Sequence, residues 1–327
     1  MKILVISNNP DRPSYRQRIG VHIGRLAEDG IEAEQVRYPK CLLCRLKLFF
    51  RAKRFDAVFL HKKRLNFLDA FLMRKFARKI IYDFDDAVMY DDRQPQKKSP
   101  KRLRDFARTI KIADVVIAGN TYLAEHAAKY SDNVRVLPTG LNVSDYDIEP
   151  DPRQDGKVRL VWIGSKSTLM YLKSLRPVLE EIGTSFDNVV LRIICDDFFE
   201  LENMEVEKVP WTLQSQYRCL RESDIGLAPL SDDRFTRGKC GFKILQYMAA
   251  SLPVVASGVG VNRDFVNQSR TGFIAQDRQQ WIDYISKLII DKDLRLKMGK
   301  AAKKDVADFD LEPISSKLSE IIQQTAT

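Results

Sequence analysis

Short runs of apolar residues rich in valine and isoleucine recur along the first half of the chain and alternate with longer amphipathic stretches. Each run has the length of a buried strand, and each intervening stretch is long enough for a crossover helix. This alternation predicts a parallel sheet with helices on both faces. The predicted strands are Ile3–Ser7, Ala57–Leu60, Lys79–Tyr82, Val115–Ala118 and Val134–Leu137.

The same pattern starts again after a polar stretch, Asp145 to Gly156, whose prolines and acidic residues are typical of a linker. The second set of predicted strands is Val158–Ile163, Val189–Ile194, Asp224–Leu227 and Pro253–Ala256. Two such sets predict an α/β protein with two Rossmann-like, doubly wound domains that face a central cleft. We assign residues 1–150 to the first domain, 151–305 to the second, and 306–327 to a C-terminal helix that can pack back on the first.

The excess of positive over negative charge is confined to the first domain. Residues 1–150 contain 29 Lys and Arg against 19 Asp and Glu, an excess that equals the net charge of +10 for the whole chain. Such asymmetry suggests an anionic partner for this half, either a membrane surface, nucleic acid or a phosphorylated substrate. A solvated surface that keeps the protein soluble is the alternative.

Nothing at the start of the sequence resembles a signal peptide, and no apolar run is long enough to span a bilayer. The five cysteines therefore indicate reduced thiols and a cytoplasmic location. Cys41 and Cys44 form a lone C-x-x-C, for which we favour packing over redox or metal chemistry. The histidines His22, His61 and His126 lie far apart in sequence, which argues against a metal cluster.

A loop with two glycines opens a predicted helix near Phe242 and carries cations suited to a diphosphate. Backbone N–H groups and the positive end of the helix dipole make such a turn an anion site. Gln246, one turn into the helix, can hydrogen-bond ribose hydroxyls. An ordinary basic surface turn is the alternative. The cations are Arg234, Arg237, Lys239 and Lys243, and the glycines are Gly238 and Gly241.

Asp83, Asp85 and Asp86 follow the strand that ends near Tyr82, where a residue facing substrate belongs. Three carboxylates so close repel one another unless something compensates them. They can orient an acceptor hydroxyl, hold a divalent metal, or cap a helix through Asp85 or Asp86. We favour contact with acceptor or donor sugar and expect no metal.

The stretch from Cys41 to Arg54 mixes bulky apolar residues with cations and contains no acid. A helix of this composition is typical of an interfacial membrane anchor, and the cations between Lys97 and Arg108 extend the basic zone. Core contacts of a crossover helix are the alternative. We expect the protein to bind peripherally to the anionic inner face of the cell membrane.

The run from Lys243 to Ser257, KILQYMAASLPVVAS, resembles the donor-binding signature of family-four retaining glycosyltransferases, which have the GT-B fold. Further pieces of the family pattern follow in the right order along nearly the whole chain, which is more specific than any single motif. They are Ile81–Ala87, Val116–Asn120, Leu137–Asn142, Val161–Ser165, Gly260–Asn262 and Thr271–Ile274.

The resemblance implies an enzyme (EC 2.4) that moves a sugar from a UDP- or GDP-linked donor, without a cofactor or metal, to a glycan or lipid-linked acceptor. It implies retention of configuration, closure of the domains over the donor, and a role in cell-surface polysaccharide or glycoconjugate synthesis such as lipopolysaccharide. Lys243 and its neighbouring cations stabilise the departing diphosphate. Asp85 takes about the place of a family histidine that faces the donor sugar.

The resemblance also assigns further binding residues. The family holds the diphosphate just after the first strand of the second domain, where this chain has Gly164, Ser165 and Lys166. Trp211 lies in the region that borders the donor base in similar enzymes. Gly241 and Phe242 begin the donor helix. Arg16 and Arg18 follow the first strand and can reach an anionic acceptor, together with Asp86, although a salt-bridged helix start is the alternative for the two arginines.

The chain departs from the family at two positions. The family usually has two glutamates eight positions apart, where this sequence has Gly238 and Gln246. Glutamine can still bond ribose as donor and acceptor, whereas glycine supplies no group for the sugar.

Two other classes of function stay open. One is a metal-dependent GT-A-type transferase that uses Asp83 and Asp85, although the second set of strands argues against a fold with one nucleotide domain. The other is a non-catalytic basic protein that binds nucleic acid or membrane. No basic–aromatic RNA signature or recognition-helix motif is present, so we expect no nucleic acid partner.

Overall fold

The computed structural model describes residues 1–11, 13–151 and 153–326, and it divides into two compact units. Unit 1 contains Met1–Leu141, Asp233–Cys240 and Phe309–Thr327, and unit 2 contains Asn142–Asp232 and Gly241–Asp308. The chain leaves the first unit at Leu141 rather than at 150, and a short later segment returns to it. The predicted linker includes residue 152, which lies outside the described residues.

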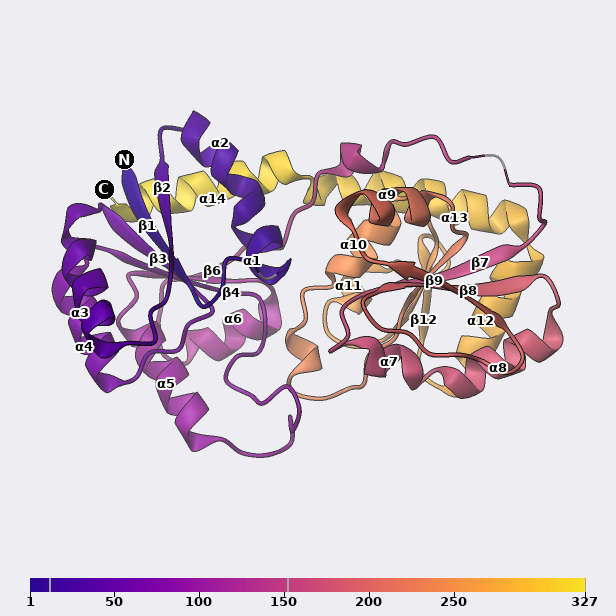
Figure 1. Ribbon diagram of the computed structural model, residues 1–327, viewed down its shortest axis with the longest axis horizontal. Helices are drawn as coiled ribbons and strands as arrows, with labels where there is room; N and C mark the ends of the chain where they lie inside the picture. Colours follow the sequence, from indigo (N-terminus) through magenta and orange to yellow (C-terminus); the bar gives the residue numbers. More distant parts are fainter. Residues whose placement is uncertain (12, 152, 327) are drawn as a thin grey trace. The chain divides into compact units, whose positions relative to one another are not determined.

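Unit 1 is built on a six-stranded sheet in which every strand is parallel to its neighbours (Figure 1). The strand order is β2-β1-β3-β4-β5-β6, so the direction of winding reverses between β1 and β3. The strands are β1 (Lys2–Ser7), β2 (Glu32–Arg37), β3 (Ala57–His61), β4 (Ile80–Phe84), β5 (Val115–Ala118) and β6 (Val134–Val136).

Helices cover both faces of this sheet because successive residues of β1 point to opposite sides. Leu4 and Ile6 belong to the core under α3–α6, while Ile3 and Val5 belong to the core under α1, α2 and α14. The helices of unit 1 are α1 (Pro13–Arg18), η1 (Gly20–His22), α2 (Ile23–Glu28), α3 (Leu42–Arg51), η2 (Ala52–Arg54), α4 (Phe67–Phe76), α5 (Pro100–Lys111), α6 (Thr121–Ala128), η4 (Thr236–Gly238) and α14 (Leu311–Ala326).

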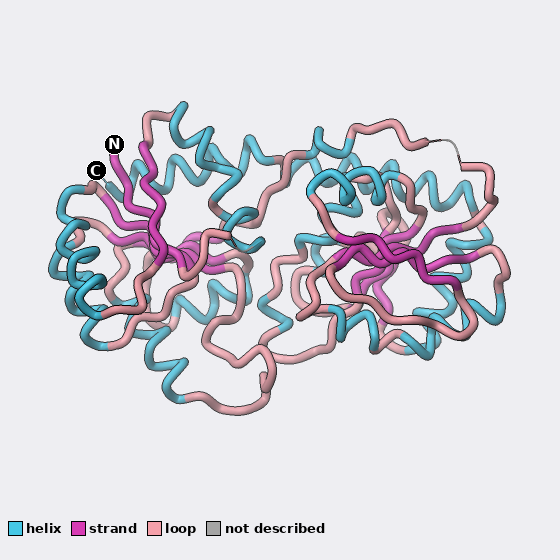
Figure 2. The backbone as a smooth tube through the Cα atoms, viewed as in Figure 1, coloured by secondary structure: helices cyan, strands magenta, loops and turns pink. Residues whose placement is uncertain are grey.

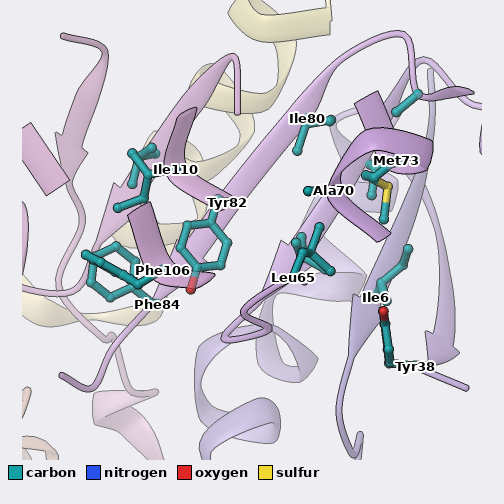
Figure 3. Packing of buried hydrophobic residues seen from close by; sticks show 14 of the residues in the cluster. Ile6, Tyr38, Leu65, Ala70, Met73, Ile80, Tyr82, Phe84, Phe106 and Ile110 are labelled. Carbon is teal, nitrogen blue, oxygen red and sulfur yellow. The ribbon is translucent and has the colours of Figure 1, made fainter. Parts of the chain in front are cut away.

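Aromatic side chains gather in the core beside α5, whereas Leu65, Ala70 and Met73 lie in the core at α4 (Figure 3). Tyr82 and Phe84 on β4 stack with ring centroids 5.4 Å apart, and Phe106 on α5 meets Phe84 edge-on at 5.3 Å. Each such pair adds about 0.5–1.5 kcal/mol beyond the area it buries. This packing fixes β4, and with it the acidic residues that follow the strand.

Unit 2 contains a second sheet (Figure 2). Its six strands are parallel and lie in the order β12-β11-β10-β7-β8-β9. Renumbered from β7, this is the strand order of the Rossmann fold, with its reversal between β7 and β10. The strands are β7 (Val158–Ile163), β8 (Val189–Cys195), β9 (Glu205–Pro210), β10 (Ile225–Ala228), β11 (Val254–Ser257) and β12 (Gly272–Ala275).

The core of unit 2 lies between this sheet and helices that include α8 and α12, while α10 and α13 pack on each other and contact β10–β12. The helices are η3 (Val143–Tyr146), α7 (Leu169–Lys173), α8 (Arg176–Ser185), α9 (Leu213–Arg221), α10 (Phe242–Ala249), α11 (Asn262–Phe265), α12 (Arg278–Ile290), α13 (Lys292–Asp305) and η5 (Val306–Phe309).

All nine strands predicted from the apolar runs are present, within a few residues at their ends. The two sheets contradict the GT-A alternative, which has one nucleotide domain. The apolar runs did not predict β2, β9 and β12. β2 and β9 are mostly exposed edge strands without a run of apolar residues.

Candidate functional site

The carboxyl ends of β7 and β10 mark the point in unit 2 where the strand order reverses. Ligands of open α/β sheets bind outside the strands at such a point. Tyr247 on α10 spans it, because its hydroxyl donates to the carbonyl of Leu227 on β10 at 3.0 Å and accepts from the N–H of Ile163 on β7 at 3.1 Å. These two bonds hold α10 across both strands.

The start of α10 requires glycine at position 241. Gly241 is the N-cap residue and has φ of +62°, in the left-handed region. A Cβ here would also lie 2.7 Å from the Phe265 ring and 2.9 Å from Val261. Lys243, in the first turn, places its ammonium 4.4 Å from the centroid of the Trp162 ring. The backbone therefore presents a helix start with a cation beside it, which is suited to an anion.

Gln216 on α9 joins two of the predicted binding residues. Its side-chain oxygen accepts from the Trp211 indole N–H at 3.1 Å and from the Gln246 amide at 3.3 Å. The Tyr146 hydroxyl also bonds the Gln246 side chain. Gln216 and Gln246 are buried, and Trp211 is half-buried. An indole and an amide, held at fixed positions, can bind a nucleoside by stacking and hydrogen bonding.

The remaining predicted residues of unit 2 lie on the surface after β7 or at the start of α10. Gly164 is packed against Trp162, since a Cβ would lie 2.4 Å from that ring. The Ser165 hydroxyl bonds Ser167 at 2.9 Å. Lys166 is exposed and pairs with Asp197 at 3.3 Å, and Phe242 is half-buried.

The other half of the predicted phosphate loop, Asp233–Cys240, belongs to unit 1. The Asn120 side-chain amide donates to the carbonyls of Gly238 and Lys239, each at 3.2 Å. The Cys240 thiol donates to the Asp85 carbonyl at 3.2 Å. In the sequence, Asn120 stands out only as the last residue of the family-like run Val116–Asn120, and its hold on this segment is a feature of the tertiary structure.

Close packing explains why position 238 is a glycine in this chain. A Cβ at this position would lie 2.8 Å from Cβ of Ala87 and 2.9 Å from Cδ2 of Leu123, closer than real Cβ contacts. The longer side chain that the family carries at this position has no room here.

The cations of this segment are engaged within unit 1. The Arg234 guanidinium donates to the carbonyl of Gln96 at 2.5 Å and lies 5.0 Å from the centroid of the Tyr90 ring. Lys239 pairs with Asp86 at 3.4 Å, and Arg237 is exposed. Of the four predicted cations, these three belong to unit 1 and Lys243 to unit 2.

Asp83 forms a buried network at the carboxyl edge of sheet 1. One of its oxygens accepts from Arg18 Nε at 3.0 Å and Nη2 at 2.8 Å, and the other lies 2.8 Å from His61 Nδ1. Burial alone would raise the pKa of Asp83, but Arg18 and His61 outweigh it and hold this pKa below its usual range. Asp83 is thus ionised inside the fold.

Asp85 and Asp86 are neutralised by two lysines. Lys62, which has φ of +54°, pairs with Asp85 at 2.9 Å and with Asp86. Burial would raise the pKa of Asp86, but Lys239 and Lys62 lower it below its usual value. The capping alternative for Asp85 and Asp86 is wrong, because the next helix begins only at Pro100. Lys62 is a non-glycine residue in the left-handed region, and such residues cluster at functional sites.

Arg18 matches the salt-bridged alternative, since it is buried against Asp83, while Arg16 is half-buried on α1. Within the described parts of the chain, no three His, Cys, Asp or Glu side chains are grouped so that they could hold a metal ion. The packing interpretation of Cys41 and Cys44 is wrong, because both are exposed.

Part of the chain is similar to a known protein family. Residues 157–291 match the family described as Glycosyl transferases group 1. The D-inositol 3-phosphate glycosyltransferase of Corynebacterium jeikeium is 25% identical over 58% of this chain. The chain matches 52% of the length of that relative, about half.

Solved structures share the fold over nearly the whole chain. The Anabaena protein HepE in complex with UDP superposes with a TM-score of 0.75 at 16% identity, covering 99% of this chain and all of its own. WaaG, a glycosyltransferase involved in lipopolysaccharide biosynthesis, gives 0.71 at 14% identity, covering 98% and 99%. The fold is GT-B, with two Rossmann-like units.

Proposed function

We propose that this chain, whose residues 157–291 match the family Glycosyl transferases group 1, transfers a sugar from a nucleoside-diphosphate donor to a glycan or lipid-linked acceptor. The observation that carries the proposal is the bonded set of Trp211, Gln216 and Gln246, which lies in the matched segment. The structurally similar Anabaena protein HepE was crystallised with UDP and with UDP-glucose, which supports UDP as the nucleotide.

In the proposed reaction, Trp211 and Gln246 bind the nucleoside, and the start of α10 binds the diphosphate. The helix dipole and Lys243 favour the negative charge that develops on the leaving diphosphate as the sugar bond breaks. Transfer proceeds with retention of configuration. We propose no metal, because Arg18, Lys62 and Lys239 already neutralise the three carboxylates at the edge of sheet 1.

The first test is binding of UDP, GDP, ADP and CMP to the full chain, measured by calorimetry with and without chelator. We expect one diphosphate to bind, unaffected by chelator. Gln246→Ala should weaken its affinity by about fivefold, because one hydrogen bond contributes about 1 kcal/mol. The control Gln279→Ala, at an exposed position of α12, should bind as the wild type does.

A chain that binds none of these nucleotides would refute the proposal. Binding lost with chelator would contradict the metal-independent reaction. If the nucleotide binds but sugar is released from none of its UDP- or GDP-linked forms, the site binds nucleotide without transfer, and the enzymatic part of the proposal fails.

We further propose that unit 1 binds the anionic inner face of the cell membrane through a surface formed by α3, α4 and α5, here named the α3–α5 surface. Large apolar side chains on it are unusually exposed, with Phe67 at 74% and Leu43 at 68%. Cations lie over its aromatic rings, such as Lys53 at 4.7 Å from the Phe50 centroid and Arg108 at 5.9 Å from that of Phe67.

This combination suits an interface where apolar groups enter the headgroup region and cations meet anionic lipid, at about 1 kcal/mol per cation. Core contacts account for only part of helix α3. Leu48 and Phe49 are buried, whereas Leu42, Leu43 and Phe50 are exposed. No helix in the described ranges is both long and apolar enough to cross a bilayer.

Co-sedimentation with phosphatidylglycerol and phosphatidylcholine vesicles tests this surface. We expect binding to the anionic vesicles alone, weakened by salt and by Phe67→Ser. The control Ile290→Ser removes an equally exposed residue, 74%, from unit 2 and should bind normally. Equal binding by both variants would exclude the α3–α5 surface, and binding to nucleic acid in place of vesicles would favour the alternative partner.

A further inference from the structure

Cys41 and Cys44 form an accessible pair of thiols at the start of α3. Both side chains are exposed, whereas Cys195 and Cys240 are buried and Cys219 is half-buried. Cys41 is the N-cap residue, with extended backbone at φ −71° and ψ 135°, and Cys44 lies in the first turn. The N–H of Arg45 donates to the Cys41 carbonyl at 3.1 Å. This hydrogen bond closes a helical turn from Cys41 to Arg45, which includes both cysteines.

This placement satisfies the geometry of a disulfide. In an α-helical turn, the Cα atoms of residues three apart lie about 5 Å from each other. Disulfides bridge Cα separations of about 4.4–6.8 Å. The two thiols are in addition within hydrogen-bonding reach of each other. A bond between the two sulfurs therefore requires only side-chain rotation.

The surroundings favour the thiolate of Cys41. Its sulfur forms no regular capping hydrogen bond, but the N–H and thiol of Cys44 and the N–H of Leu43 face it and lower its pKa. The Cys41 sulfur in turn raises the pKa of Cys44. Arg45 and Lys47 place positive charge near the pair, and Cys41 to Arg54 contains no acid. A low-pKa, exposed thiol at a helix start is the reactive kind.

We propose that Cys41 and Cys44 form a reversible dithiol–disulfide site that exchanges with a low-molecular-weight disulfide, with Cys41 as the attacking thiol and Cys44 as the resolving one. The Cys41 thiolate attacks one sulfur of the small disulfide and releases one thiol, leaving a mixed disulfide on Cys41. The Cys44 thiolate then attacks the Cys41 sulfur and releases the second thiol. The pair loses two electrons and two protons, and the small disulfide gains them.

Disulfide exchange fits this pair better than metal binding. A closed thiolate site for zinc needs four ligands, and no third His, Cys, Asp or Glu joins the two sulfurs among the described residues. Both cysteines belong to unit 1, whereas the proposed nucleotide-binding residues belong to unit 2. The proposal does not depend on glycosyl transfer.

The test is titration of the full chain with oxidised glutathione, followed by thiol counting and mass mapping. We expect the wild type to fall from five free thiols to three, with loss of two hydrogen atoms from the peptide containing Cys41 and Cys44, and to recover with dithiothreitol. Cys44→Ser should trap one glutathione on Cys41. The control Cys219→Ser should still lose two thiols.

A second measurement uses the unaltered chain. Alkylation with limiting iodoacetamide should label Cys41 faster than Cys44, and both before Cys195 and Cys240. Five free thiols after oxidised glutathione would overturn the proposal. So would stable glutathione adducts on both cysteines without an internal disulfide, or a wild-type reaction that the double variant Cys41→Ser/Cys44→Ser reproduces.

Discussion

Arg18→Met removes the guanidinium that neutralises a buried carboxylate in unit 1. Arg18 and Asp83 are 3% and 1% exposed. The guanidinium donates twice to Asp83 and, through Nη1, to the carbonyls of Leu137 at 2.6 Å and Pro138 at 3.0 Å. In the variant, Asp83 keeps only its contact with His61, and the two carbonyls lose a donor.

The expected loss in the free energy of unfolding is large. Breaking one side of a buried ion pair costs about 3–5 kcal/mol, against a total stability of about 5–15 kcal/mol for a typical domain. The double variant Arg18→Met/Asp83→Asn leaves no uncompensated charge, so it should be more stable than Arg18→Met alone. Arg25→Met, which removes only surface ion pairs, should cost less than about 1 kcal/mol.

Urea unfolding followed by two signals separates the units. All three tryptophans, Trp162, Trp211 and Trp281, lie in unit 2, so their fluorescence follows that unit, whereas far-ultraviolet circular dichroism follows both. Arg18→Met should shift the dichroism transition more than the fluorescence transition. A loss below about 1 kcal/mol, or a double variant no more stable than the single one, would refute the role assigned to this ion pair.

Three further outcomes are expected. Gly241→Ala should destabilise unit 2 by about 1–3 kcal/mol in urea unfolding, because the backbone of Gly241 is left-handed. The loss should exceed that of Gly156→Ala, because Gly156 also has positive φ but a Cβ there would meet open space. Equal losses in the two variants would contradict the contact with Phe265. Gln216→Leu should weaken nucleotide binding in calorimetry by about tenfold, because the two side chains that it holds become free to move; unchanged affinity would contradict this. Burial lowers the pKa of His22 to about 4, so only the unfolded chain gains this proton between pH 6.5 and 4. Stability of unit 1 should therefore fall by about 3 kcal/mol across that window, and the fall should be smaller in His22→Asn, as measured by urea unfolding at each pH.

Much of the fold followed from local patterns. A strand buried on both faces needs a continuous apolar run, so β1, β3–β5, β7 and β8 could be read directly. An edge strand has no such requirement. β2 has the sequence EAEQVR and is mostly exposed, so its residues carry no signal that separates it from a loop.

The candidate site was only partly predictable. The glycine and cation at the start of α10 are local features, and the structure begins this helix at Phe242 as the sequence predicts. Gln216 carries no local signal, because its role comes from partners that are 5 and 30 positions away in sequence. Its side chain is buried in the structure.

The sequence by itself determined the alternation of strands and helices, the two units and the segment that matches a family, since each depends on residues close together in the chain. Only the tertiary structure decided which charges neutralise each other. Arg18 meets Asp83 across 65 positions, and Asn120 bonds Gly238 across 118. Such contacts form where parallel strands bring their carboxyl ends to one edge, and no periodicity along the chain records which side chains will meet there.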